Sequence, residues 1–331
     1  MRPARRRALL AAGALAAAPF GTGAQPAETI RRIGYLSGLP ASHQRALWAR
    51  EMLRNNLKAA GYDAERNLAI EWRWGNGDPA RLPALAEDLV RRGVEVIVAS
   101  SNAEISAAMR ATRAIPIVML YGIAPVEVGF IESLARPGGN VTGTAWASPQ
   151  TFAKALQILR EAKPSIVRIA MLGDPSNPGM ARFRAENDRA ARALGLTLER
   201  FDAVSPEQVP AVLERIAASR PDAFYLAISP ALETRLREIG AFVLRERLVS
   251  ISPSNVFVLD GEGLMSYSPI PWERLGRAVT YIDRILRGAK PGDLPVDLPT
   301  NFSLVISART ARAIGFTVPT SLLLRADRVI E

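Results

Sequence analysis

The stretch VEVIVASSN, residues 94–102, determines how we interpret the fold of this chain. Apart from Glu95, its first six residues are apolar and mostly β-branched, which is typical of a strand that helices cover on both faces of a parallel sheet. Its last three residues are small and polar, as is common where a helix starts, and a helical pattern follows over residues 102–112. The stretch therefore predicts a strand of a parallel sheet that leads directly into a helix.

The same alternation of short apolar strands and longer amphipathic helices extends in both directions. Before the quoted stretch it predicts strands at 32–37 and 68–74 and helices at 44–60 and 80–92, and after it a strand at 117–120. A second series has helices at 149–162, 179–194, 206–219 and 231–246 and strands at 168–172, 196–201, 223–228, 248–251 and 264–268. Two such series predict an α/β fold with two doubly wound, Rossmann-like lobes and a ligand cleft between them.

The last predicted elements have to be divided between the lobes, because they follow a complete second series. They are a helix at 271–287, a Pro-rich extended connection at 291–299 and a strand at 302–306. We expect residues 29–145 and 271–291 to form the first lobe. Residues 146–270 and 292–331 would form the second lobe, with three crossovers between the two.

The first residues of the chain have the pattern of a secretory signal peptide. Four arginines precede an apolar run over residues 8–18, and small residues lead up to Ala24. The run is too short to span a membrane, so we expect no stable membrane insertion. The pattern predicts a signal peptide at 1–24, cleavage near Ala24 with Ala18 as the other candidate, and a periplasmic location. Because Arg6-Arg7 also resembles a twin-arginine signal, the export route, Sec or Tat, stays open.

The composition argues against several classes of function. The chain has no cysteine and a single histidine, His43, so it offers neither a thiolate metal site nor a histidine cluster, and we expect no metal. The turns after the strands at Ser37, Ser100 and Gly173 lack the glycine patterns that hold nucleotide phosphates, and we expect no cofactor. The formal net charge is +10, but basic and acidic residues are interleaved, which does not favour nucleic-acid binding.

Ligands of open parallel sheets bind beyond the carboxyl ends of the strands. At these ends the first lobe has Ser37, Gly38, Ser100, Ser101, Asn102, Tyr121 and Gly122, and the second lobe has Asp174, Asn177 and Ser229. Asn255 and Tyr267 join them from segments near the crossovers. We expect these twelve residues to include the ligand contacts.

Two interpretations of Ser100-Ser101-Asn102 stay open. The hydroxyls and the amide could hold an anion, such as a ligand carboxylate, at the start of the following helix. They could equally be ordinary helix caps. Tyr121, Trp146 and Tyr267 could stack on a planar ligand, although Trp146 could equally pack in the core. Trp48, Trp72, Trp74 and Trp272 are expected to pack in or around the lobes.

Three stretches carry a resemblance to a known family. They are IEWRWG at 70–75 with RLPALA at 81–86, LARPGGNVTG at 134–143, and the chain from GLMSY at 263–267 to ADRVIE at 326–331. In these the chain resembles the ABC transporter substrate-binding proteins of the TrpX-like group, which have the type 1 periplasmic binding protein fold. The resemblance implies a monomeric periplasmic receptor that is not an enzyme. It would pass a small organic ligand, such as an aromatic amino acid or a related carboxylate, to ABC permease subunits.

The chain departs from that family in one place. Members commonly have an acidic residue soon after the glycine equivalent to Gly122, where this chain reads Gly122-Ile123-Ala124-Pro125. An amino acid's ammonium group favours a nearby carboxylate, so this departure leaves the ligand open.

Two other functional classes are weighed against the receptor. A ligand-sensing regulator of the sugar-repressor type would need a DNA-binding headpiece before the first strand. A small-molecule hydrolase could use Asp174, Glu127 or Asp202 as acid or base, but no paired nucleophile is evident.

Overall fold

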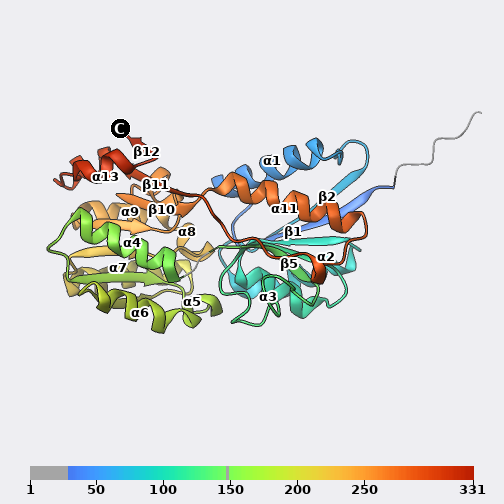
Figure 1. Cartoon of the computed structure of the whole chain (residues 1–331), viewed down its shortest axis with the longest axis horizontal. Coiled ribbons are helices and arrows are strands. Elements are labelled where there is room, and N and C mark those ends of the chain that lie inside the picture. Colours follow the sequence, from blue (N-terminus) through green and yellow to red (C-terminus); the bar gives the residue numbers. More distant parts are fainter. Residues whose placement is uncertain (1–28, 147–148) are drawn as a thin grey trace, which may run out of the picture.

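The quoted stretch forms strand β3 (Val96–Ala99) at the centre of a five-stranded parallel sheet in the order β2-β1-β3-β4-β5. The other strands are β1 (Arg31–Ser37), β2 (Leu68–Trp74), β4 (Ile117–Gly122) and β5 (Val141–Ala145). This computed structural model describes residues 29–146 and 149–331 (Figure 1). The predicted signal peptide, 1–24, lies outside the described residues. Every residue of β3 is buried, as its apolar sequence predicts.

Helices cover both faces of this first sheet. Helices α1 (Gln44–Ala59) and α11 (Pro271–Leu286) pack together on one face, where Leu53 and Ile282 belong to the same apolar core as Val96 and Val98. Helices α2 (Leu82–Arg91), which follows the 3-10 turn η1 (Pro79–Arg81), and α3 (Asn102–Ala111) cover the other face, where Leu89 meets Ile97. Alternate residues of β3 thus face different helix layers, which explains its continuous apolar pattern.

The second sheet has seven strands in the order β12-β11-β10-β9-β8-β6-β7. Their bounds are β6 (Arg168–Gly173), β7 (Thr197–Asp202), β8 (Ala223–Leu226), β9 (Val249–Ser252), β10 (Met265–Pro269), β11 (Phe302–Ser307) and β12 (Arg328–Ile330). Only β10 and β11 pair antiparallel among the described strands. The sequence pattern does not predict β12, which has only three residues.

The helices of the second lobe also form two layers. One layer includes α4 (Pro149–Ala162), α6 (Arg184–Ala193), α12 (Ala308–Ala313) and α13 (Thr320–Arg325), and the other includes α7 (Val209–Ser219), which follows η2 (Pro206–Gln208), α9 (Leu236–Arg245) and α10 (Val256–Leu259). Two predicted helices are each split in the structure. Residues 179–194 contain α5 (Pro178–Arg182) and α6, and residues 231–246 contain α8 (Pro230–Glu233) and α9. Both short pieces begin with a proline that follows a capping Asn177 or Ser229.

The chain passes between the lobes three times: from β5 to α4, from β10 to α11, and from η3 (Pro291–Asp293) to β11. The two lobes lie side by side along the long axis of the molecule (Figure 1). The sequence pattern predicts that residues 292–331 belong to the second lobe, but residues 294–297 pack on the first. Thr142 Oγ1 donates to the Leu294 carbonyl at 2.7 Å, and Ala145 N donates to the Asp297 carbonyl at 2.9 Å. An extended segment without a turn signal does not indicate which sheet edge it will meet.

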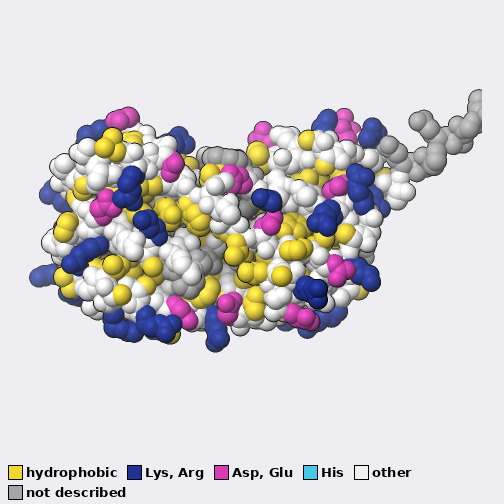
Figure 2. Space-filling model, in the orientation of Figure 1, with side chains coloured by type: hydrophobic (Ala, Val, Ile, Leu, Met, Phe, Trp, Pro, Cys, Tyr) yellow, Lys and Arg dark blue, Asp and Glu magenta, His cyan; other side chains and the backbone are white. Residues whose placement is uncertain are grey.

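Charged side chains of both signs are scattered over the two lobes on the face shown in Figure 2. Many of them pair, for example Arg73 and Arg92 with Asp88. Among the residues that the structure describes, no helix combines the length and the apolar character needed to cross a membrane.

Candidate ligand-binding site

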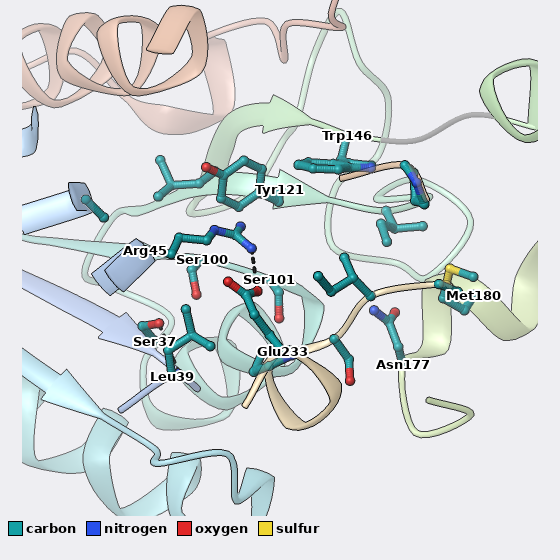
Figure 3. A pocket seen from close by; sticks show the side chains of 18 of the residues that line it. Ser37, Leu39, Arg45, Ser100, Ser101, Tyr121, Trp146, Asn177, Met180 and Glu233 are labelled. Carbon is teal, nitrogen blue, oxygen red and sulfur yellow. Dashed lines mark hydrogen bonds and ion pairs between the residues drawn. The ribbon is translucent and has the colours of Figure 1, made fainter. Parts of the chain in front are cut away.

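A cavity lies between the lobes, where the carboxyl ends of both sheets meet (Figure 3). Six of the twelve predicted site residues line it: Ser37, Ser100, Ser101 and Tyr121 from the first lobe, and Asn177 and Ser229 from the second. Its wall is otherwise largely apolar and aromatic. The aromatic residues that line it are Tyr35, Trp48, Tyr121, Trp146, Phe152, Phe183 and Tyr225.

The aromatic wall is held by ring contacts. Trp146 meets Tyr121 edge-on with ring centroids 5.0 Å apart, and the Trp146 backbone N–H donates to the Gly122 carbonyl at 2.8 Å. Trp72 and Trp74 pack on Tyr35. Trp48 packs against the core of the first lobe, as expected, and also lines the cavity. Burial raises the pKa of the Tyr35 phenol well above its ordinary value, so Tyr35 presents a neutral ring to a ligand.

Glu104 determines how Ser100 and Ser101 face the cavity. Its fully buried carboxylate accepts hydrogen bonds from the Gly38 backbone N–H at 2.5 Å, from Ser100 Oγ at 3.0 Å and from Ser101 Oγ. Because a carboxylate only accepts, both hydroxyl hydrogens point to Glu104. The Glu104 carboxylate thus takes the hydroxyl donors that the sequence suggested for a ligand carboxylate. The Ser100 and Ser101 oxygens remain available to accept hydrogen bonds from a ligand.

The remaining polar residue of that stretch has a structural role. Asn102 is fully buried, donates through Nδ2 to the Ile123 carbonyl at 2.8 Å and accepts from the Ile123 backbone N–H at 2.7 Å. Ser101 occupies the N-cap position of α3, but its side chain makes no capping hydrogen bond. Asn102 therefore fixes the segment after β4, which carries part of the cavity wall.

Two cavity residues that the strand-end rule does not select form an ion pair between the lobes. Arg45 Nη1, near the start of α1 in the first lobe, donates to Glu233 Oε2, at the end of α8 in the second lobe, at 2.6 Å. The Arg45 guanidinium also lies over the Tyr121 ring, 5.0 Å from its centroid. Burial is the largest single influence on the pKa of Arg45 and lowers it, but the combined effects of Glu233, Tyr121 and Tyr35 raise it and hold the pKa above its ordinary value. Arg45 lies eight residues after the end of β1 and Glu233 seven residues after the end of β8, so neither is among the strand-end residues that the sequence pattern selects.

The other predicted site residues lie outside this cavity. Gly38 and Gly122 are buried behind the wall, and Tyr267 stacks on Phe302 within the second lobe with ring centroids 5.3 Å apart. Asp174 lines a smaller neighbouring pocket, accepts from Ser176 Oγ at 2.6 Å, and has a pKa that burial raises. Asn255 lines an outer pocket that shares Arg45, Trp48, Tyr121 and Trp146 with the cavity.

The sequence profile of the ABC transporter substrate binding proteins matches residues 39–330, nearly the whole of both lobes. The chain belongs to this family. A tyrosine-binding protein from Clostridioides difficile is 24% identical over 260 residues, which cover 78% of this chain and 74% of that protein.

Solved structures share the fold of this substrate-binding protein. An ABC domain from Streptococcus pneumoniae in complex with L-Trp has a TM-score of 0.84 at 23% identity and covers 91% of this chain and 100% of its own. A conserved domain protein from Vibrio cholerae has a TM-score of 0.83 at 23% identity, with 91% and 99% covered. The predicted two-lobed, type 1 periplasmic binding protein fold is thus confirmed.

Family membership decides between the functional classes that the sequence left open. The chain is an ABC transporter substrate-binding protein, and this family consists of binding proteins, which favours the receptor over the regulator and the hydrolase. Within residues 29–146 and 149–331, no group of three or more His, Asp or Glu side chains could hold a metal ion.

Proposed function

We propose that this protein is the periplasmic receptor of an ABC importer and binds a small organic ligand between its lobes. The ligand has a planar or apolar body and a carboxylate, as in an aromatic amino acid or a related compound. One observation carries this proposal: a single cavity takes aromatic walls and polar groups from both lobes. The tyrosine-binding relative and the structure in complex with L-Trp support an aromatic amino acid.

The cavity explains how binding would close the protein. Ser37, Ser100 and Ser101 contact the ligand from the first lobe, and Asn177 and Ser229 contact it from the second. A ligand that touches both walls makes all of its contacts only when the lobes are together, so it stabilises the closed state by differential affinity. The closed form is the one that docks on the permease subunits.

The remaining proposals concern the chain before and after export. Residues 1–24 direct export by the Sec or the Tat route and are removed near Ala24. The mature protein is a periplasmic monomer that alters no bound molecule, because binding and release are all that transport requires of it. Finding Met1 intact on cytoplasmic protein would contradict the proposed export.

Ligand identification tests the main proposal. Protein purified without added ligand is denatured, and the small molecules released are identified by mass spectrometry. The compound found should bind to the refolded protein with a change in fluorescence, because Trp48 and Trp146 line the cavity. It should also be recovered unchanged after incubation. Conversion of the compound by the protein, or the absence of any bound or binding small molecule, would contradict the proposal.

A further inference from the structure

Among the described residues, one carboxylate oxygen of Glu233 has a hydrogen-bond partner and the other has none. The residue is 3% exposed, and its Oε2 accepts from Arg45. Its other oxygen, Oε1, is buried and has no hydrogen-bond partner among the described residues, although Glu233 lines the cavity. A buried acceptor without a donor is unfavourable, so a ligand that donates a hydrogen bond to this oxygen should bind more tightly.

The imidazole of His43 does not satisfy this oxygen. His43 Nδ1 lies 3.8 Å from Glu233 Oε1. However, His43 Nδ1 accepts a hydrogen bond from the Arg45 backbone N–H at 3.3 Å. A ring nitrogen that accepts carries no proton, so it has none to give to Glu233.

The second lobe contributes another acceptor to the same cavity. Asn187 is 4% exposed, and its Oδ1 is buried without a hydrogen-bond partner in the described part of the chain. The hydroxyl hydrogens of Ser100 and Ser101 are already used by Glu104. The cavity is therefore rich in acceptors, and an ammonium group with its three donors matches it.

Charge balance restricts the ligand further. Arg45 and Glu233 compensate each other's charge, and the buried carboxylate of Glu104 is held separately by its own three donors. A zwitterion therefore leaves the Arg45–Glu233 pair balanced, whereas a simple acid or amine adds one buried charge that this pair does not compensate. A guanidinium has five N–H donors and Glu233 uses one of them, which leaves donors for a carboxylate.

We propose that Glu233 accepts the ammonium group of the ligand and Arg45 binds its carboxylate, so that the cavity selects α-amino acids over the corresponding acids and amines. This inference rests on the proposed function. It assigns the ammonium group to an acid from the second lobe, in a chain that has Ala124 rather than an acidic residue soon after Gly122.

Matched probes test the inference by calorimetry on the purified full-length protein after bound molecules have been removed. The probes are L-tryptophan and L-tyrosine, their des-amino analogues indole-3-propionate and 3-(4-hydroxyphenyl)propionate, and the amines tryptamine and tyramine. We expect an amino acid to bind best, and each one-sided analogue to bind about ten- to a hundredfold more weakly, the range for losing one hydrogen bond to a charged group.

The variant Glu233→Gln should reverse the preference. The substitution removes the negative charge, so the affinity for the amino acid should fall about ten- to a hundredfold. The affinity for the des-amino analogue should not fall, because its carboxylate pairs with the unopposed charge of Arg45. A misfolded variant would lose both ligands and could not show such a reversal. Glu238→Gln is the matched control, because Glu238 lies on the surface in an ion pair with Arg235, and its affinities should equal those of the wild type.

Other results would overturn the inference. It fails if the des-amino analogue binds the wild type as well as the amino acid does, or if Glu233→Gln weakens both equally. It also fails if no amine-bearing probe binds while a ligand without an amino group is released from the protein. In each of these cases the proposed function stands, because a small molecule is still bound. If no probe binds and no small molecule is released, both fail.

Discussion

Arg45 and Glu233 join the two lobes through a hydrogen-bonded ion pair of 2.6 Å, and the Glu233 side chain is 2% exposed. The two residues are 188 positions apart in the sequence, and they lie on α1 of the first lobe and α8 of the second. Buried charges of this kind are favourable only when they are paired, and removing one partner typically costs about 3–5 kcal/mol. Removing one of these two charges should therefore change how closely the two lobes lie together.

The first prediction concerns this link. Arg45→Met leaves Glu233 without its partner, so the unliganded protein should favour separated lobes and show a larger radius of gyration in small-angle X-ray scattering. The double variant R45M/E233M removes both charges and should return toward the compact wild type. Equal radii for the single and double variants would show that the unpaired charge does not control closure.

The second prediction concerns Gly179, at the start of α5. A Cβ atom at this position would lie 2.5 Å from the Ile123 carbonyl oxygen and 2.7 Å from Asn102 Nδ2, both in the first lobe. Gly179→Ala should act as a wedge that prevents full closure, and should weaken ligand binding at least tenfold in calorimetry, because contacts on both lobes form only in the closed state.

Gly276→Ala is the control for this wedge. Gly276 lies within helix α11, and a Cβ atom there would have nothing within 4 Å. Its ligand affinity should be unchanged, and its stability should rise by about 0.5–1 kcal/mol because alanine favours a helix. Equal affinities for Gly179→Ala and the wild type would mean that the ligand binds without this contact between the lobes.

Periodicity is sufficient to predict strands such as β3 and β8, because they are apolar on both faces and both faces are covered, but it does not predict the three-residue strand β12. It does not predict that residues 294–297 pack along β5 of the first sheet, since an extended segment carries no pattern that favours one sheet over the other. For the cavity, the strand-end rule selects Ser37, Ser100 and Asn177.

The same rule misses Arg45 and Glu233. In sequence they look like charged positions on solvated helix faces, and only the docking of one lobe on the other buries them. The role of Ser100 and Ser101 also depended on Glu104, whose burial no local pattern indicates.

The third prediction is a pH dependence from Asp222. Its Oδ2 accepts from the Arg168 backbone N–H at 2.8 Å and from the Val167 backbone N–H at 2.9 Å, and these bonds, chiefly the one from Arg168, lower the pKa of the carboxyl. A lowered folded-state pKa stabilises the protein above the unfolded value of about 3.9, and this contribution is lost as the pH falls through the folded value. Asp222→Asn should therefore lower the melting temperature at pH 7, and the difference should shrink between pH 4 and pH 2. A difference that does not change with pH would contradict it.

The fourth prediction has the opposite sign and concerns Asp174. Burial is the largest influence on this carboxyl and raises its pKa, against hydrogen bonds from Ser176 that lower it. A raised folded-state pKa means that the charged form is disfavoured in the native protein, so stability is greatest below the unfolded value of about 3.9 and is lost as the pH rises through the folded value. Asp174→Asn keeps an acceptor for Ser176 but carries no charge, so it should melt at a higher temperature than the wild type at pH 7. Thermal melts of both proteins from pH 7 to pH 3 should show this advantage disappearing in acid. An advantage that persists at pH 3, or a lower melting temperature at pH 7, would mean that the hydrogen bonds of Asp174 outweigh its burial.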